Sequence, residues 1–237
     1  MAHSWRYAMG TALVAYGVLH VLGRRAGSSQ DERRQRLPGD DIVSRPWLVT
    51  NHAVTIDRPP GEVWPWLTQL GWHLGGYYTP VWVDRLLFRQ NRPSLDHLDP
   101  ALVRRLAPGD TIPDGPPGTA EYVVDEVEAP HALVLHSTTH LPPGWRAKYG
   151  ADIDWTWCLH LTPLAGNSTR LQLRVRGRTS PWWLTALYWA TIVPADYLMA
   201  TGMLRGIKHR VEAAAAEDLD WAVTAATTPA AGTRAPA

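Results

Sequence analysis

Two histidines have a spacing that could bind a metal ion. His136 and His140 lie four residues apart, which would place both on one face of a helix. The alternating pattern around them predicts a strand instead, in which four residues span roughly 13 Å. The two rings therefore cannot share one ion, and no HExxH motif or carboxylate cluster supplies a third ligand. We expect no metal site here, and we expect both histidines to face solvent or to end a strand.

The single cysteine, Cys158, could in principle act as a nucleophile. It follows Trp155 and Trp157 and precedes Leu159 in a predicted strand, whereas a reactive thiol needs a positioned base and an electropositive, exposed setting. We therefore predict a buried, structural cysteine. The sequence has no GxSxG elbow, and the glycines at 71, 75 and 76 do not form a dinucleotide fingerprint. Covalent hydrolysis and nicotinamide chemistry are disfavoured, and we expect no cofactor.

The composition excludes several broad classes of protein. The chain has 237 residues, with 23 Lys+Arg against 22 Asp+Glu, so it lacks the net charge of a nonspecific nucleic-acid binder. Its 45% hydrophobic and 19% charged residues exclude disorder of the whole chain. Among the aromatics are 13 Trp and 8 Tyr but a single Phe. Aromatic rings with a polar atom suit cavities, interfaces and membrane boundaries.

The N-terminal region contains an uncharged run, residues 7–23, with Arg6 before it and Arg24-Arg25 after it. Its length is at the lower limit for crossing a bilayer. Residues 1–25 are therefore interpreted as a hydrophobic helix that either associates with a membrane or packs on the domain. The surplus of arginines after the run would place the body of the protein in the cytoplasm. Residues 26–47 are polar and rich in turn signals, which predicts a linker.

The rest of the chain reads as strand, short helices, several strands and a long helix. Residues 48–57 alternate as a strand, and a helix kinked at Pro65 follows Pro59-Pro60. A further short helix is expected at 100–106. Closely spaced strands predict an antiparallel sheet, at 111–112, 120–128, 132–139, 155–162 and 169–178. Residues 181–195 form an uncharged, Trp-rich stretch before the last helix. That helix has one apolar stripe, made by Val193, Tyr197, Ala200, Leu204, Ile207 and Val211. Asp196 is assigned to its polar side.

Four segments resemble the SRPBCC (START-like, polyketide cyclase and lipid transport) superfamily, in a bacterial subgroup. They are VTIDRPPGEVWPWL (54–67), Gly75-Gly76-Tyr77-Tyr78, Pro108-Gly109-Asp110 and Met203-Leu204-Arg205-Gly206-Ile207-Lys208. The chain departs from the subgroup at Leu74 and at Asp84-Arg85. The resemblance covers residues 48–213 and implies an α+β helix-grip fold, in which a curved antiparallel sheet wraps around a long C-terminal helix. The domain is placed at 48–221, and residues 222–237 are predicted to be a disordered Ala/Thr/Pro-rich tail.

The resemblance implies a mostly apolar cavity between the sheet and the last helix. Members of the superfamily bind lipids, sterols, polyketides or quinones there, and some catalyse cyclisation or dehydration. In this geometry the acid–base candidates are His73, Tyr77, Tyr78, Asp84 and His136. The candidate ligand-binding residues are Trp66, Leu70, Trp72, Tyr77, Tyr78, Trp82, Trp155, Trp157, Leu173, Tyr197 and Leu204. Plain core packing of the same aromatic residues is the alternative.

Three functions remain open from the sequence. The first is binding of a hydrophobic small molecule by a membrane-associated protein. The second is a cyclase or dehydratase without metal or nucleotide cofactor, acting through positioned polar groups. The third is a protein-interaction module. The strand at 170–178 is relevant to membrane association, because its arginines alternate with apolar residues and form one charged face. We expect these arginines to be solvated, or else to face anionic lipid headgroups or a partner.

Overall fold

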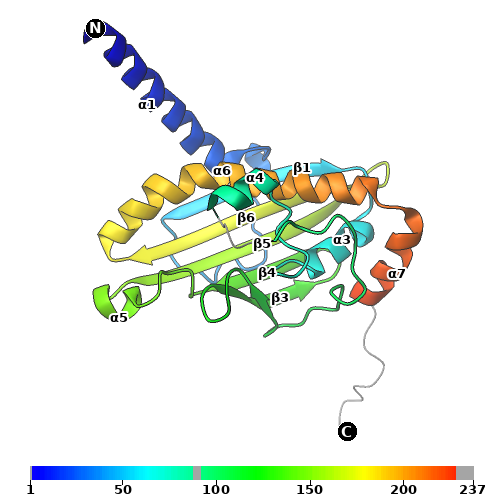
Figure 1. Cartoon of the computed structure of the whole chain (residues 1–237). Coiled ribbons are helices and arrows are strands. Elements are labelled where there is room, and N and C mark those ends of the chain that lie inside the picture. The colour runs from blue at the N-terminus through cyan, green and yellow to red at the C-terminus, as the bar shows by residue number, and fades with distance from the viewer. Residues whose placement is uncertain (1, 88–91, 228–237) are drawn as a thin grey trace.

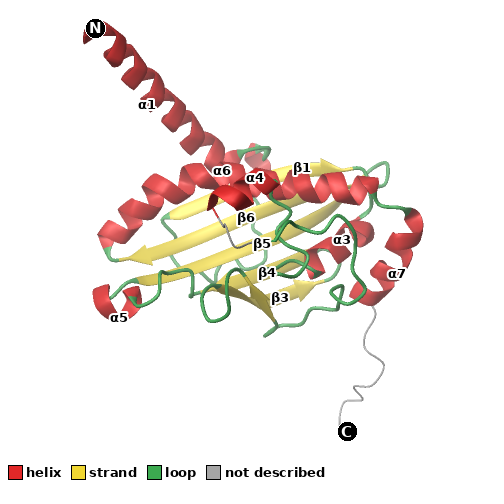
Figure 2. Ribbon diagram, in the orientation of Figure 1, coloured by secondary structure: helices red, strands yellow, loops and turns green. Residues whose placement is uncertain are grey.

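The computed structural model describes residues 2–87 and 92–227, without the side chains of residues 2–6, 8, 84, 86 and 87. It is an α+β helix-grip fold, as the sequence predicts: a curved antiparallel sheet with a long C-terminal helix along one face (Figures 1 and 2). The strand order is β1-β6-β5-β4-β3-β2. The strands are β1 (Leu48–Ile56), β2 (Thr111–Pro113), β3 (Glu121–Glu128), β4 (Ala132–Ser137), β5 (Asp152–Leu164) and β6 (Ser168–Ser180). The helices are α1 (Ala2–Arg25), α2 (Gln30–Arg34), α3 (Pro60–Thr68), α4 (Val81–Leu87), α5 (Trp145–Tyr149), α6 (Trp182–Ala213) and α7 (Ala216–Thr227).

Strand alternation decides which side chains face α6. On β5, Trp155, Trp157 and Leu159 lie on the face toward α6, and the residues between them lie on the opposite face. The pairing extends this alternation to the neighbouring strands, since Trp157 is opposite Val175 on β6 and Leu135 on β4. Leu135, Leu159 and Val175 are fully buried in the main core. The inner face of the sheet and α6 therefore form one apolar layer.

Helix α6 is longer than the sequence predicts. Its stripe is buried, with Ala200 and Leu204 in the core, but the helix begins already at Trp182 and runs through Pro194. The Trp-rich stretch at 181–195, described from the sequence as preceding the last helix, thus belongs mostly to that helix. Proline has no N–H to donate to the carbonyl oxygen four residues earlier, that of Ala190. The Tyr16 hydroxyl of α1 donates to this oxygen instead, at 2.6 Å, so the helix continues without an orphaned carbonyl.

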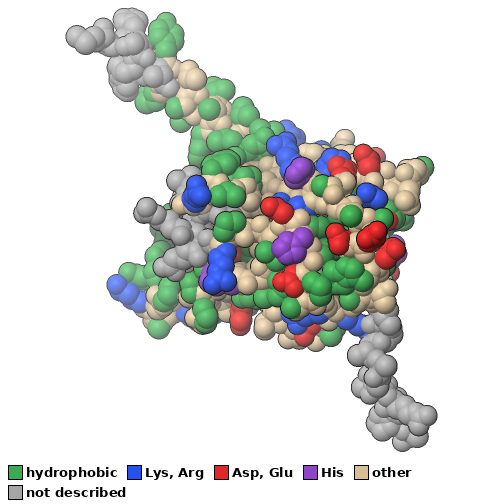
Figure 3. All heavy atoms as spheres, turned by 45° about the vertical axis from the view of Figure 1, so that its right-hand side comes forward, with side chains coloured by type: hydrophobic (Ala, Val, Ile, Leu, Met, Phe, Trp, Pro, Cys, Tyr) green, Lys and Arg blue, Asp and Glu red, His purple; other side chains and the backbone are tan. Residues whose placement is uncertain are grey.

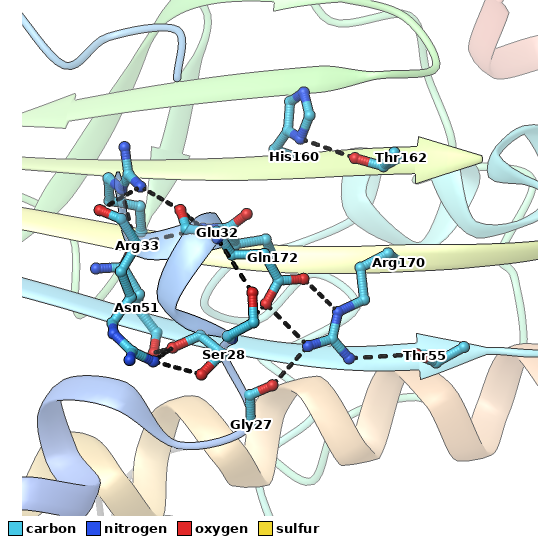
Figure 4. Close-up of polar contacts among 12 residues, drawn as sticks. Gly27, Ser28, Glu32, Arg33, Asn51, Thr55, His160, Thr162, Arg170 and Gln172 are labelled. Carbon is cyan, nitrogen blue, oxygen red and sulfur yellow. Dashed lines mark hydrogen bonds and ion pairs between the residues drawn. The ribbon is translucent and has the colours of Figure 1, made fainter. Parts of the chain in front are cut away.

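The outer face of the sheet is covered by the segment predicted to be a linker. Arg174 is 3% exposed, and its guanidinium donates to Asn51 Oδ1, to Asp40 Oδ2 (both 2.7 Å) and to the Glu32 carbonyl (2.8 Å). Figure 4 shows Arg170 reaching Glu32, which its Nε contacts at 2.7 Å. Arg170 and Arg174 bind residues 27–40, so the expectation that they are solvated is wrong, whereas Arg178 at the end of the strand is exposed as expected. Alternation alone could not show that another segment returns over this face.

The arginine contact also sets the acidity of Glu32. A hydrogen bond from Arg170 is the main cause that lowers the pKa of the Glu32 carboxyl, against the opposing effect of burial. The same carboxylate accepts from the Ser29 amide, while the Ser29 hydroxyl accepts from the Glu32 amide. This reciprocal capping box begins α2 and fixes it on the sheet.

Helix α1 packs on α6 only through its C-terminal part. The His20 ring lies 4.3 Å from the Trp189 ring, and Gly23 approaches the Val193 carbonyl. The preceding turns of α1 project from the body of the protein (Figure 1). In these turns Leu13 and Val14 are 65% and 68% exposed, and Figure 3 shows hydrophobic side chains on the surface of the projecting helix. Within the described ranges, no helix combines the length and apolar character needed to cross a membrane. A spanning anchor is therefore not supported, and contact with a membrane surface stays a prediction.

Smaller differences concern the loops and the C-terminal end. Residues 100–102 form a turn, and the helix expected at 100–106 is absent. Helix α7 continues the chain to Thr227, with Leu219, Ala222 and Ala226 buried. The predicted tail thus begins later than residue 222, because these small apolar residues complete a helix that packs beside α3. Residues 228–237 lie outside the described part of the chain.

Candidate functional site

A cavity lies between α6 and the inner face of the sheet. Its large chamber has a volume of about 440 Å³, which is in the range of small-molecule sites. A small chamber of about 40 Å³ adjoins it. Both chambers are bordered by the same four residues, Asp114, Trp157, Asp196 and Met199.

Aromatic rings form much of the cavity wall. The Tyr122 ring lies 4.9 Å from the Trp157 ring and 4.6 Å from the His140 ring. The Tyr77 ring also contacts Trp157, with ring centroids 5.9 Å apart and the two planes nearly perpendicular, at 83°. The Tyr188 hydroxyl of α6 donates to the His140 carbonyl at 2.7 Å, which ties the helix to the loop after β4. The wall is thus a connected aromatic cluster held by both the sheet and α6.

Two histidine–aspartate pairs border this cavity. In the first, His52 Nε2 lies 2.9 Å from Asp196 Oδ2. His52 is opposite Leu173 in the β1–β6 pairing, and Leu173 lines the small chamber, so the His52 side chain points to the α6 side. Its Nδ1 has no hydrogen-bond partner among the described residues, and its side chain is fully buried.

The second pair is His140 with Asp114. His140 Nε2 lies 2.8 Å from Asp114 Oδ2, and His140 Nδ1 lies 2.7 Å from Ser137 Oγ. The Thr139 amide donates to Ser137 Oγ, and Thr139 Oγ1 lies 3.1 Å from the same oxygen. The His140 ring is thus held between Ser137 and the Asp114 carboxylate.

The order Ser137–His140–Asp114 looks like a hydrolytic triad, but Ser137 is not placed as a nucleophile. Its side chain is 3% exposed and does not border either chamber. Its hydroxyl contacts His140 Nδ1 while Nε2 contacts Asp114, as in a triad, but a buried hydroxyl away from both chambers cannot reach a substrate there. The triad atoms therefore serve to hold the Asp114 carboxylate.

The phenols of the wall remain protonated. Burial is the main cause that raises the pKa of Tyr77 and of Tyr122 well above the usual value, and the negative charge of Asp114 raises both further. Asp196 adds to the effect on Tyr122. The Tyr77 hydroxyl donates to the Pro113 carbonyl at 3.1 Å.

The structure distributes the predicted ligand-binding residues over three places. Five of them border the cavity: Trp72, Tyr77, Trp155, Trp157 and Leu173. Trp66, Leu70 and Leu204 lie in the core and border neither chamber. The remaining three, Tyr78, Trp82 and Tyr197, line a separate open groove between α4 and α6. Whether any of them binds a ligand stays a prediction.

Of the predicted acid–base residues, only Tyr77 borders the cavity. His73 is exposed and stacks on Trp72, with ring centroids 4.8 Å apart. The Tyr78 hydroxyl is buried between the side-chain amide of Gln69 and the Trp66 carbonyl. His136 pairs with Asp154 on the outer face of the sheet, at 2.7 Å. The side chain of Asp84 lies outside the described part of the structure.

Four polar residues matter most at this site, namely His52, Asp114, His140 and Asp196, and none of them was among the predicted site residues. Two of them carry a usable signal in the sequence. His52 is two and four residues from Val54 and Ile56, so it lies on the same side of the alternating strand as these apolar residues. Asp196 precedes Ala200 by four residues, the spacing of one helix face, so its assignment to the polar side is wrong. Asp114 lies in a loop, and nothing local predicts its position.

Cys158 is buried on the outer face of the sheet, away from the cavity, beside Leu37 and Val134. Burial is the main cause that raises the pKa of its thiol to about 12. A structural role, as the sequence predicts, follows from this environment.

Comparisons with known proteins find only distant likenesses, all of them to solved structures. No family model matches the chain, and no curated protein is similar in sequence. Among solved structures, a protein of Mesorhizobium loti is 17% identical, covers 70% of this chain and 97% of its own, and has a TM-score of 0.40. Norcoclaurine synthase of Thalictrum is 12% identical over 68% of this chain and 94% of its own, with a TM-score of 0.35. The Aha1 protein of Colwellia psychrerythraea is 14% identical over 65% and 93%, with a TM-score of 0.33.

Proposed function

We propose that this protein binds a hydrophobic small molecule in the cavity between the sheet and α6. The observation that carries the proposal is the large chamber, about 440 Å³ in volume and walled by Tyr122, Trp155, Trp157 and Tyr188. Apolar walls with a few convergent polar groups are the usual form of a small-molecule site. A ligand that covers these walls gains roughly 25 cal/mol for each Å² of apolar surface removed from water.

The proposal is tested by filling the chamber. Ala195 of α6 borders it, so Ala195→Phe is expected to place a ring where the ligand would lie. We expect the variant to weaken binding of the neutral fluorescent probe N-phenyl-1-naphthylamine by roughly tenfold or more, because overpacking of a site excludes its occupant. Titration of the full-length chain, followed by probe fluorescence, measures this.

Ala186→Phe is the matched control, since Ala186 is an exposed residue of the same helix that borders neither chamber. Its probe affinity should equal that of the unchanged protein. Equal affinities of all three proteins would show that the probe binds elsewhere, and the proposal would be wrong.

A second candidate function, a cofactor-independent cyclase or dehydratase, is favoured by the two histidine–aspartate pairs at one cavity. The Asp114 or Asp196 carboxylate would remove a proton from a carbon next to a carbonyl group, and the Tyr77 or Tyr122 phenol would donate a hydrogen bond to the carbonyl oxygen. This chemistry would exchange that proton with solvent.

Incubation with a poly-β-ketone in deuterated water, followed by mass spectrometry, tests the second candidate. We expect deuterium uptake at least roughly a hundredfold slower in Asp114→Asn than in the unchanged protein, with probe affinity kept. Uptake at the uncatalysed rate in the unchanged protein would exclude the enzyme and leave the binding function standing.

A further inference from the structure

The charges on the cavity wall all have one sign. Asp114 and Asp196 border both chambers, and none of the described residues that line either chamber is Lys or Arg. The two carboxylates come from separate elements, the loop after β2 and the middle of α6, so the fold brings them to one place. Their side chains are 24% and 14% exposed, which means that each is largely removed from water.

Each carboxylate contacts one histidine ring. His52 Nε2 lies 2.9 Å from Asp196 Oδ2, and His140 Nε2 lies 2.8 Å from Asp114 Oδ2. A carboxylate has about four acceptor positions, so one such contact leaves room for a further donor. Carboxylates that are largely removed from water are costly unless they are paired and hydrogen-bonded, because burial removes the water that stabilises them.

The aromatic rings around the carboxylates fit a cation as well. Trp157 borders both chambers, as the two carboxylates do, and its ring centroid lies 4.9 Å from that of Tyr122 and 5.9 Å from that of Tyr77. Trp72 completes the lining of the small chamber. The faces of Trp and Tyr rings attract ammonium groups, and the attraction is stronger where water is excluded. Aromatic faces together with carboxylates are a recurrent way to bind amines and quaternary ammonium groups.

We infer that the ligand of this cavity is an amphiphilic cation, an amine or quaternary ammonium compound. Its charged group lies between Asp114 and Asp196 against Trp157, and its apolar part fills the large chamber along Trp155 and Ile192. The inference rests on the proposed binding function and names the chemical class of the ligand. A neutral or anionic ligand would offer these carboxylates no opposite charge.

Three ligands of equal chain length and different charge test this inference. Decyltrimethylammonium, decanol and decanoate, each below its micelle-forming concentration, are used to displace N-phenyl-1-naphthylamine from the full-length chain. We expect the cation to displace the probe at a concentration roughly tenfold or more below that of decanol, with decanoate weakest. In Asp196→Asn and in Asp114→Asn, the preference for the cation should fall by roughly tenfold while the affinity for decanol is kept.

Asp154→Asn is the matched control, because Asp154 also pairs with a histidine, His136, but on the outer face of the sheet. It should leave the preference for the cation unchanged. Equal displacement by decanol and the cation, or stronger displacement by decanoate, overturns the inference while the binding function stands. Failure of the probe and of all three ligands to bind overturns the proposed function, and the inference with it. Probe affinity in each variant shows whether the cavity is still formed, so a loss of cation preference is not confused with unfolding.

Discussion

Replacement of Arg174 by alanine is expected to lower the free energy of unfolding by about 3–5 kcal/mol. The guanidinium is 3% exposed and joins three separate parts of the chain, through Asn51 of β1, Asp40 and the Glu32 carbonyl. Its removal leaves a half-buried carboxylate and buried carbonyl oxygens without their donor, and each such group costs free energy when water cannot reach it. The segment at 27–43 would then detach from the sheet. Urea unfolding followed by circular dichroism measures the change.

Arg178→Ala is the control, since Arg178 belongs to the same strand and is exposed. Its effect should stay within roughly 0.5 kcal/mol. A loss below about 1 kcal/mol in Arg174→Ala would mean that the segment at 27–43 is held by other contacts.

Gly206→Ala is expected to lower the free energy of unfolding by about 1–3 kcal/mol and to weaken ligand binding. A Cβ atom at position 206 would overlap the carbonyl oxygen of Tyr78. Tyr78 cannot easily move away, because its hydroxyl is held by Gln69 and by the Trp66 carbonyl. Any shift would also displace Tyr77, the next residue, from the cavity wall. Thermal unfolding and a probe titration measure the two effects.

The same substitution at Gly17 separates overlap from helix propensity. Gly17 lies in α1, where an added Cβ meets no atom of the described chain within 4 Å. Gly17→Ala should therefore be neutral, or stabilising by up to about 1 kcal/mol, because alanine favours the helix over glycine. If Gly206→Ala behaves like Gly17→Ala, then α6 and the loop at 77–80 are not in close contact in solution.

The fold was largely predictable, because its signals are local. The alternation of β5 and β6 and the spacing of Ala200, Leu204 and Ile207 each identify an element without knowledge of the rest. The errors concern contacts between distant segments. A proline such as Pro194 predicts the end of a helix, and only the Tyr16 hydroxyl from the far end of the chain explains why α6 continues. An alternating arginine row likewise predicts a solvated face of the sheet. The strand's own sequence cannot show that residues 27–43 cover that face.

The candidate site was less predictable than the fold. The aromatic wall followed from the resemblance and from strand alternation, which placed Trp155, Trp157 and Leu173 at the cavity. The positions of the charged residues did not follow from the sequence. Strands β3 to β6 lie between Asp114 and Asp196 in the sequence, and neither residue belongs to a recognisable motif. Their importance comes from the fact that both border the same cavity, which sequence spacing cannot predict.

The measurement that tests the central claim most directly is photoaffinity labelling of the full-length chain with a neutral long-chain alcohol that carries a diazirine. The labelled residues are identified by peptide mass spectrometry. We predict labels on residues of the cavity wall, such as Met199, Trp157 and Tyr122, and their loss in Ala195→Phe. Labels confined to the exposed apolar residues of α1, or to the groove at Trp82, would contradict the claim that the cavity is the binding site.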